Sequence, residues 1–228
     1  MNTSPTLLST KKLSVAQKEL VLNTGLRLVE YNAVTIDFLE VKGPENTISN
    51  IIFTSKNAVH AVFNQKSLPF YKIENSEIRV FCVGENTKKL LKDNGCNVIE
   101  VAYNASDLAK IIIKRYKSDS FLFFCGNMRR DELPDLLKQN NISIEEQTVY
   151  NTYLTSNKFN RLFDGILFFS PSAIRSYVST NNIGESILFC IGNTTASEAR
   201  KYTDNVVVAN RPTIENVIVQ AVTYYRNK

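Results

Sequence analysis

The sequence predicts an α/β protein built from two small doubly wound parallel-sheet domains joined by a two-stranded β connector. Short apolar runs alternate with helical patterns, which is typical of parallel strands joined by helical crossovers. The same order of elements also appears twice along the chain. Finally, the stretches 33–47 and 143–153 alternate apolar and polar residues, which favours strands with one wet face.

The clearest repeat joins a strand, a small polar turn and a helix. An apolar run, a hydroxyl-bearing turn and the start of a helical pattern occur in Ile51–Val59 and again in Ile166–Ile174. A second apolar run then ends on a glycine, Gly84 or Gly192, and opens another helix. A short β run follows in each copy, and after it we expect a capped helix that starts near Ser106 or Thr213.

A further pair of segments precedes the two copies. The apolar run from Leu7 and the run from Phe121 each lead into a helix that closes at Gly25 or Asn141. Each of these helices is followed by one of the two alternating stretches. Because strands of a parallel sheet are buried on both faces, we expect these stretches to lie outside the sheets, as an exposed paired connector.

The composition is that of a globular protein with a mild basic excess. The 228 residues suit one large domain or two small ones, and Lys+Arg 27 against Asp+Glu 22 gives a net charge of +5. The sequence has no block of like charges that would indicate nucleic-acid binding. A small anionic ligand remains compatible with the net charge. No apolar stretch approaches the ~20 residues of a membrane span, and no signal-peptide pattern opens the chain. We therefore expect a soluble, cytoplasmic protein with no membrane partner.

The chain shows none of the common cofactor motifs. Its four cysteines are far apart and its single histidine, His60, lies in a helical pattern, so we expect no metal site and no disulfide framework. Glycine-rich nucleotide loops and the nucleophile elbow are also missing. The sequence thus predicts no cofactor.

The ends of the predicted strands carry small polar residues. In open α/β sheets, ligands lie beyond the carboxyl ends of the strands, where helix N-termini favour anions. Hydroxyl and amide residues at these turns are also common helix N-caps, so capping is the alternative for each one. Their repetition in both halves favours an anion-binding cleft between the domains. The turns are Ser9–Lys12, Thr54–Asn57, Gly84–Thr87, Gly126–Arg130, Ser170–Ser172 and Gly192–Thr195.

Short motifs in a fixed order give the chain a family resemblance. They are Ile52–Val59, Val83–Thr87, Cys125-Gly126 with Arg129, Val149-Tyr-Asn-Thr152, Phe168–Ser172, Ile191–Ala196 and Pro212–Val217. In this order and spacing they resemble uroporphyrinogen-III synthases along nearly the whole chain. The resemblance implies one domain from 1–32 plus 154–228, a second from 48–142, and connector strands at 33–47 and 143–153.

The resemblance also implies a reaction. The family closes hydroxymethylbilane, a linear polycarboxylate tetrapyrrole, into uroporphyrinogen III, inverting the terminal pyrrole ring and releasing water without a cofactor. Such a substrate agrees with the net charge of +5 and with the turns whose helix N-termini favour anions. We expect a monomer, and we consider a hand-over of substrate from the enzyme that forms hydroxymethylbilane.

Residue roles follow from the matching motifs. Tyr150 matches the tyrosine of the family's Val-Tyr-x-Thr motif and is the predicted catalytic residue, donating to the leaving hydroxyl. Lys11 and Lys12 stand where the family often has an arginine, and a lysine lacks its bidentate fork. The predicted substrate-binding residues are Lys11, Lys12, Thr54, Ser55, Asn57, Thr87, Gly126, Arg129, Ser170, Ser172, Thr194 and Thr195.

Two other functions compete with this one. A non-catalytic two-lobed binding module for small anions would use the same fold, but such modules usually carry a signal peptide or a fused DNA-binding segment. A sugar-phosphate enzyme would need a glycine-rich phosphate loop or an evident catalytic histidine or carboxylate. Neither feature stands out in the sequence.

Overall fold

The computed structural model describes residues 4–42, 49–64 and 78–227. Its contacts divide the chain into two compact units. Unit 1 is Met1–Thr35 with Tyr153–Lys228, and unit 2 is Ile36–Thr152. The predicted ranges 1–32, 33–47 and 48–142 also take in residues 1–3, 43–48 and 65–77, which lie outside the described residues.

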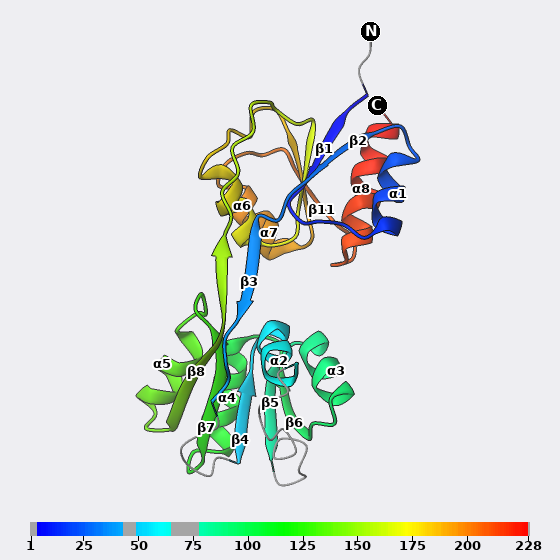
Figure 1. Ribbon diagram of the computed structural model, residues 1–228. Helices are drawn as coiled ribbons and strands as arrows, with labels where there is room; N and C mark the ends of the chain where they lie inside the picture. The colour runs from blue at the N-terminus through cyan, green and yellow to red at the C-terminus, as the bar shows by residue number, and fades with distance from the viewer. Residues whose placement is uncertain (1–3, 43–48, 65–77, 228) are drawn as a thin grey trace. The chain divides into compact units, whose positions relative to one another are not determined.

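Unit 1 is a parallel five-stranded sheet in the order β11-β10-β9-β1-β2. Figure 1 labels β1, β2 and β11 among these strands. Its strands are β1 (Thr6–Ser9), β2 (Arg27–Glu30), β9 (Gly165–Phe168), β10 (Ile187–Cys190) and β11 (Val206–Val208). Its helices are α1 (Val15–Leu22), α6 (Pro171–Val178), α7 (Asn193–Ala199) and α8 (Ile214–Arg226). From β1 the chain winds outward to β2 and, later, from β9 outward to β11. The strand order therefore reverses between β1 and β9.

Helices cover both faces of this sheet because adjacent strand residues point to opposite sides. Leu7 packs in a cluster with Val21 of α1 and Val217 of α8. Its neighbour Leu8 packs in a second cluster with Ile174 of α6. This is the doubly wound arrangement that the alternating strand and helix patterns predict.

Unit 2 is built on a six-stranded sheet in the order β3-β8-β7-β4-β5-β6. Its strands are β3 (Val34–Phe38), β4 (Asn50–Phe53), β5 (Arg79–Val83), β6 (Val98–Ala102), β7 (Ser120–Gly126) and β8 (Ser143–Leu154). Its helices are α2 (Lys56–Phe63), α3 (Glu85–Asp93), α4 (Ala105–Arg115) and α5 (Glu132–Gln139). The chain winds from β4 to β6 in one direction and from β7 to β8 in the other, so the order reverses between β4 and β7.

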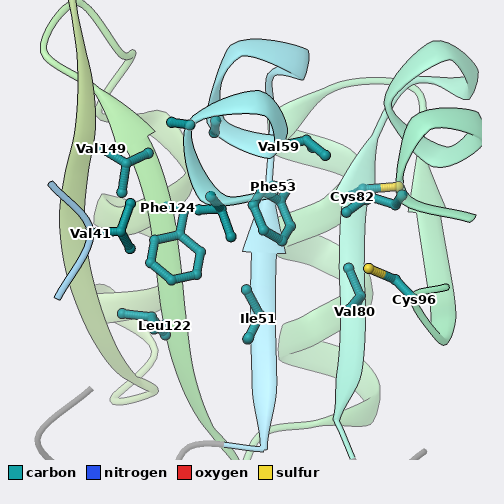
Figure 2. Packing of buried hydrophobic residues seen from close by; sticks show 14 residues of the cluster. Val41, Ile51, Phe53, Val59, Val80, Cys82, Cys96, Leu122, Phe124 and Val149 are labelled. Atoms are coloured by element: carbon teal, nitrogen blue, oxygen red, sulfur yellow. The ribbon is translucent and has the colours of Figure 1, made fainter. Parts of the chain in front are cut away.

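Figure 2 shows the core between this sheet and helices α2 and α3. Phe53 of β4 and Phe124 of β7 lie with their ring centroids 5.5 Å apart. Val149 of β8 lies beside Phe124 at one end of the cluster and is fully buried. The opposite face of the sheet packs Phe81 and Phe123 against α4 and α5. Unit 2 is therefore doubly wound as well.

The two alternating stretches form β3 and β8, which pair with each other. Their register is antiparallel, because the Ala33 carbonyl accepts from Thr155 whereas Leu39 donates to the Val149 carbonyl. The boundary between the units falls inside both strands. A paired β connector is thus present.

The expectation that 143–153 lies outside the parallel sheet is wrong for most of this stretch. Ser143–Tyr150 of β8 pairs in parallel with Ser120–Gly126 of β7. The alternation has a different cause: in the described part of the chain, β8 has the short β3 on one side, so its earlier part has only β7 as a full-length strand neighbour. A strand at the edge of a sheet is covered less completely by neighbouring elements. Alternate side chains of such a strand can therefore be exposed to solvent even in a parallel sheet.

Hydroxyl and amide side chains cap several helices as the sequence indicates. Ser55 caps α2, Ser170 caps α6 and Thr213 caps α8, each accepting from a backbone N–H in the first turn. The helix expected near Ser106 begins at Ala105, and its cap is Asn104, which accepts from the N–H of Asp107 at 2.8 Å. In the described part of the chain, no helix is both long and apolar enough to cross a membrane.

Burial of thiols predicts that the protein loses stability in alkaline solution. Burial raises the pKa of Cys82 from 9.0 to about 11 and that of Cys190 from 9.0 to about 12. Above pH 9 the unfolded chain therefore releases these protons while the folded chain retains them, so the free energy of unfolding falls as the pH rises. Urea unfolding at a series of pH values from 8 upward measures this slope. A midpoint that stayed constant or rose through the window would contradict the prediction.

Candidate functional site

The carboxyl edge of each sheet gathers the predicted turns. In unit 2, the turns after β7, β4 and β5 are neighbours because those strands are neighbours, and Tyr150 of β8 lies opposite Gly126 at the end of β7. This edge includes the point where the strand order reverses, between β4 and β7. Ligands of open α/β sheets bind at such points. The predicted residues that the fold places here are Thr54, Ser55, Asn57, Thr87, Gly126, Arg129 and Tyr150.

Tyr150 reaches across this edge to the start of α2. Its phenol donates a hydrogen bond to Ser55 Oγ at 3.2 Å. The same Ser55 oxygen caps α2 by accepting from the N–H of Asn57 at 3.1 Å. Tyr150 and Ser55 are 95 residues apart in the chain, and both were predicted as site residues. The fold thus joins the predicted catalytic phenol to one predicted binding turn.

A β-bulge turns the Tyr150 side chain toward α2. The β7–β8 register shifts after Cys125, which lies opposite Thr148, so that Gly126 lies opposite Tyr150. Val149 is therefore the extra residue on β8. Neighbouring residues of a regular strand point to opposite faces, yet Val149 and Tyr150 pack in the same core cluster. The bulge allows both to face α2.

Gly126 leaves the space that the Tyr150 ring occupies. A Cβ at Gly126 would lie 2.8 Å from the Tyr150 hydroxyl oxygen and closer still to two ring carbons. Real Cβ atoms do not approach other atoms so closely, so any larger residue would displace the ring. Gly126 has no positive φ, and its smallness rather than its backbone freedom is what the site requires.

The turn after β5 offers backbone N–H groups. Gly84 adopts φ 83° and is the N-cap of α3, with no side-chain capping hydrogen bond. Its conformation suits glycine because other residues are strained there. Thr87 follows in the first turn of α3 and is only 5% exposed. This helix start can therefore present N–H groups to an anion without displacing a side-chain cap.

Arg129 lies beside acidic partners. Its guanidinium forms ion pairs with Asp131 and with Glu146 of β8. Lys138 contacts the same Glu146 carboxylate at 2.8 Å. The positive charge of Arg129 is thus balanced within the fold, and a substrate carboxylate would have to compete with these carboxylates for it. Substrate binding by Arg129 stays a prediction.

The carboxyl edge of unit 1 carries the remaining predicted residues. They are Lys11, Lys12, Ser170, Ser172, Thr194 and Thr195, which follow β1, β9 and β10. These three strands are neighbours, and the strand order reverses between β1 and β9. The two lysines and Thr194 are exposed, whereas Thr195 is only 3% exposed. Like Gly84, Gly192 begins its helix without a side-chain cap.

The hydroxyls of Ser170 and Ser172 already have partners. Ser170 Oγ accepts from the N–H of Ala173 at 3.2 Å, and Ser172 Oγ accepts from the Arg175 guanidinium at 3.2 Å. Helix capping, the alternative that the sequence left open, therefore accounts for the Ser170 hydroxyl. A ligand at this turn would meet backbone N–H groups first.

We expect Ser170→Ala to lower stability and to cost little activity, because the hydroxyl is a cap. Loss of an N-cap typically costs about 1 kcal/mol. Thr213→Ala removes the corresponding cap of α8 and serves as the matched control. Thermal melts and turnover rates of both variants test this. If Ser170→Ala abolished turnover and left the melting temperature intact, the hydroxyl would act on the substrate instead.

Sequence reasoning missed one residue at the edge of unit 2. Asn127 directly follows β7, and its side chain pairs with the backbone of Thr152 on β8. It lies inside a turn that the sequence did single out, yet no residue pattern reveals this contact. Among the described residues, no three His, Cys, Asp or Glu side chains are grouped as metal ligands would be.

A family model decides what kind of protein this is. The model described as uroporphyrinogen-III synthase HemD matches residues 20–218. The chain belongs to the uroporphyrinogen-III synthase family. The predicted family and the predicted enzyme class, which performs the cyclisation step in tetrapyrrole biosynthesis, are confirmed.

Curated relatives agree with the uroporphyrinogen-III synthase assignment. The chain is 29% identical to uroporphyrinogen-III synthase of Saccharomyces cerevisiae, over 88% of this chain and 86% of that protein. It is 28% identical to porphyrin biosynthesis protein HemD of Ruminiclostridium josui over 74% of this chain. That match spans 36% of the Ruminiclostridium protein, so the chain corresponds to only part of it.

A solved structure supports the fold. The crystal structure of uroporphyrinogen-III synthetase from Helicobacter pylori matches with a TM-score of 0.69, over 96% of this chain and 99% of that chain. The two sequences are 18% identical in this comparison. The likeness confirms the predicted two-domain α/β fold class, which uroporphyrinogen-III synthases share.

Proposed function

We propose that this chain converts hydroxymethylbilane into uroporphyrinogen III, and that Tyr150 assists the loss of the terminal hydroxyl. The observation that carries the assignment is the family match, which spans residues 20–218. The observation that supports the role of Tyr150 is its phenol, which lies at the carboxyl edge of unit 2 within 3.2 Å of Ser55 Oγ. No comparison favours the non-catalytic alternative.

The phenol can act on the leaving group in one step. Its O–H donates a proton, or a strong hydrogen bond, to the terminal hydroxyl oxygen as the carbon–oxygen bond breaks and water departs. Because a phenol has only one hydrogen to donate, the hydrogen bond from Tyr150 to Ser55 Oγ must break when the phenol turns to the leaving group. Ser55 still accepts from the N–H of Asn57, so the start of α2 is preserved.

The remaining steps belong mainly to the substrate. The carbocation left by water is attacked by the substituted carbon of the terminal pyrrole, which gives a spiro intermediate. Ring opening and reclosure then invert that pyrrole, and the proton lost on rearomatisation restores the phenol. Holding the rings in one geometry supplies most of the acceleration in such a reaction.

The polycarboxylate substrate accounts for the polar turns. Helix starts at Gly84 and Gly192 have no side-chain caps, and their N–H groups can bind carboxylates. Lys11 and Lys12 are exposed beside the turn after β1 and add positive charge. We propose that Thr54, Ser55, Asn57, Thr87, Gly126, Arg129, Ser170, Ser172, Thr194 and Thr195 line the turns that the carboxylates contact.

Several finer features complete this proposal. We propose that the enzyme works in the cytoplasm as a monomer, without a cofactor, and can take its unstable substrate directly from the enzyme that forms it. We also propose a first domain of 1–32 plus 154–228 and a second that combines 48–142 with most of 143–153, because Ser143–Tyr150 pairs with β7. The strands β3 and β8 carry the chain between these two domains.

Genetic complementation tests the function in cells. The chain should restore tetrapyrrole synthesis and growth to a bacterial strain that lacks uroporphyrinogen-III synthase. The control is Asn140→Ala, which should also complement because Asn140 is the C-cap of α5, at the end of that helix away from the carboxyl edge of the sheet. Failure of the folded, expressed chain to restore growth would count against the proposed function.

A further inference from the structure

We propose that Asn127 is a positioning residue for Tyr150. It holds the part of β8 that follows the bulge and extends beyond the end of β7. The inference rests on the role proposed for Tyr150. β7 ends at Gly126, whereas β8 continues to Leu154. The residue that carries the reacting phenol therefore lies opposite the last residue of the neighbouring strand.

Asn127 extends the pairing beyond the end of β7. Its backbone N–H donates to the Tyr150 carbonyl at 3.2 Å. Its side-chain Oδ1 accepts from the Thr152 N–H at 2.7 Å, and its Nδ2 donates to the Thr152 carbonyl at 3.3 Å. Asn127 thus binds β8 on both sides of Asn151. Its side-chain amide makes the two hydrogen bonds to Thr152 that the backbone of a neighbouring strand would otherwise make.

The position of this contact gives it a consequence for the site. A β-bulge disrupts the ladder locally, and here the extra residue is Val149. Tyr150 is placed between that bulge and the Asn127–Thr152 pair. On the opposite edge of β8, Leu39 of the chain after β3 donates to the Val149 carbonyl at 3.0 Å. The backbone around Tyr150 is therefore held from both sides, which fixes where its phenol points.

The chemistry of this contact requires an amide. Asparagine presents one donor and one acceptor in a single plane, which match the N–H and the carbonyl of Thr152. Aspartate keeps the acceptor and loses the donor, and alanine loses both. Asn127 is exposed, and hydrogen bonds in water add little to global stability, so we expect its variants to fold.

Kinetics of single and double variants form the first part of the test. We expect Asn127→Ala to lower kcat for uroporphyrinogen III about 10-fold with KM unchanged, because small misplacements of a reacting group are costly. Asn127→Asp should lie between wild type and Asn127→Ala. Asn140→Ala is the control, since its side chain donates to the Leu136 carbonyl at the end of α5, and it should retain the wild-type kcat. In a Tyr150→Phe background, Asn127→Ala should add no further loss.

Fluorine NMR separates positioning from a general structural effect. The protein is labelled with 3-fluorotyrosine, and the Tyr150 signal among its 10 tyrosines is assigned by its absence in Tyr150→Phe. We expect Asn127→Ala, and not Asn140→Ala, to shift or broaden that signal. An unmoved Tyr150 signal, or a wild-type kcat in Asn127→Ala, overturns the inference. If Tyr150→Phe itself turned over at the wild-type rate, the role proposed for Tyr150 would fail, while the NMR result would still decide whether Asn127 positions its ring.

Discussion

Tyr150→Phe should form uroporphyrinogen III about 10²-fold more slowly than the wild-type chain, at the low end of what general acid catalysis contributes. The substitution keeps the ring over Gly126 and removes only the O–H that reaches Ser55. Because hydroxymethylbilane closes spontaneously without inversion, the slowed variant should yield a mixture enriched in isomer I. Separation of the isomers after a fixed reaction time measures both effects.

The stability of Tyr150→Phe serves as its internal control. Loss of one partly exposed hydrogen bond costs only about 1 kcal/mol, so the melting temperature should change little. Substrate binding should also stay near the wild-type value, since the polar turns are intact. If the variant formed isomer III at the wild-type rate, Tyr150 would be a packing residue, and a bound water or a substrate group would have to supply the proton.

Gly126→Ala should reduce isomer III formation by a similar factor for a steric reason. The added Cβ would lie 2.8 Å from the Tyr150 hydroxyl oxygen, so the ring has to move away from Ser55. Misplacing a reacting group by about 1 Å can cost about 10²-fold. The backbone of Gly126 suits alanine, and the displaced atoms belong to the tip of a side chain, so the fold should survive.

Gly165→Ala is the matched control for this effect. A Cβ at Gly165 would lie 2.8 Å from Leu7 and 2.9 Å from Phe189, inside the core of unit 1. Overpacking of this kind costs about 1–3 kcal/mol, so Gly165→Ala should lower the melting temperature. We expect Gly126→Ala to show the reverse pattern, with lost activity and a nearly unchanged melting temperature. Wild-type activity in Gly126→Ala, or a melting temperature as low as that of Gly165→Ala, would contradict the steric role.

The fold could be predicted because its signals are local. Apolar runs, polar turns and caps such as Ser55 and Thr213 each occupy a few neighbouring residues, and the repetition of their order indicated two doubly wound sheets. The carboxyl ends of parallel strands then followed from topology. That reasoning placed the turn at Ser55 among the candidates, whereas Tyr150 became one through the family resemblance of Val149–Thr152.

The finer arrangement of the site depends on register, which no local pattern reveals. The bulge at Val149 decides which face Tyr150 takes, and a shift of one residue would reverse it. The Asn127–Thr152 pair depends on the same register. The pairing of Arg129 with Glu146 likewise arises because β8 lies beside β7, a placement that the half-wet pattern of 143–153 did not predict.

The most direct measurement is the isomer composition of the uroporphyrinogen that the purified wild-type chain forms from enzymatically generated hydroxymethylbilane. A parallel reaction without the chain gives the spontaneous background of isomer I. We expect isomer III to dominate with the chain present, and its initial rate to rise in proportion to protein concentration. Formation of isomer I alone, at the background rate, by a chain with an intact melting transition would contradict the proposed function.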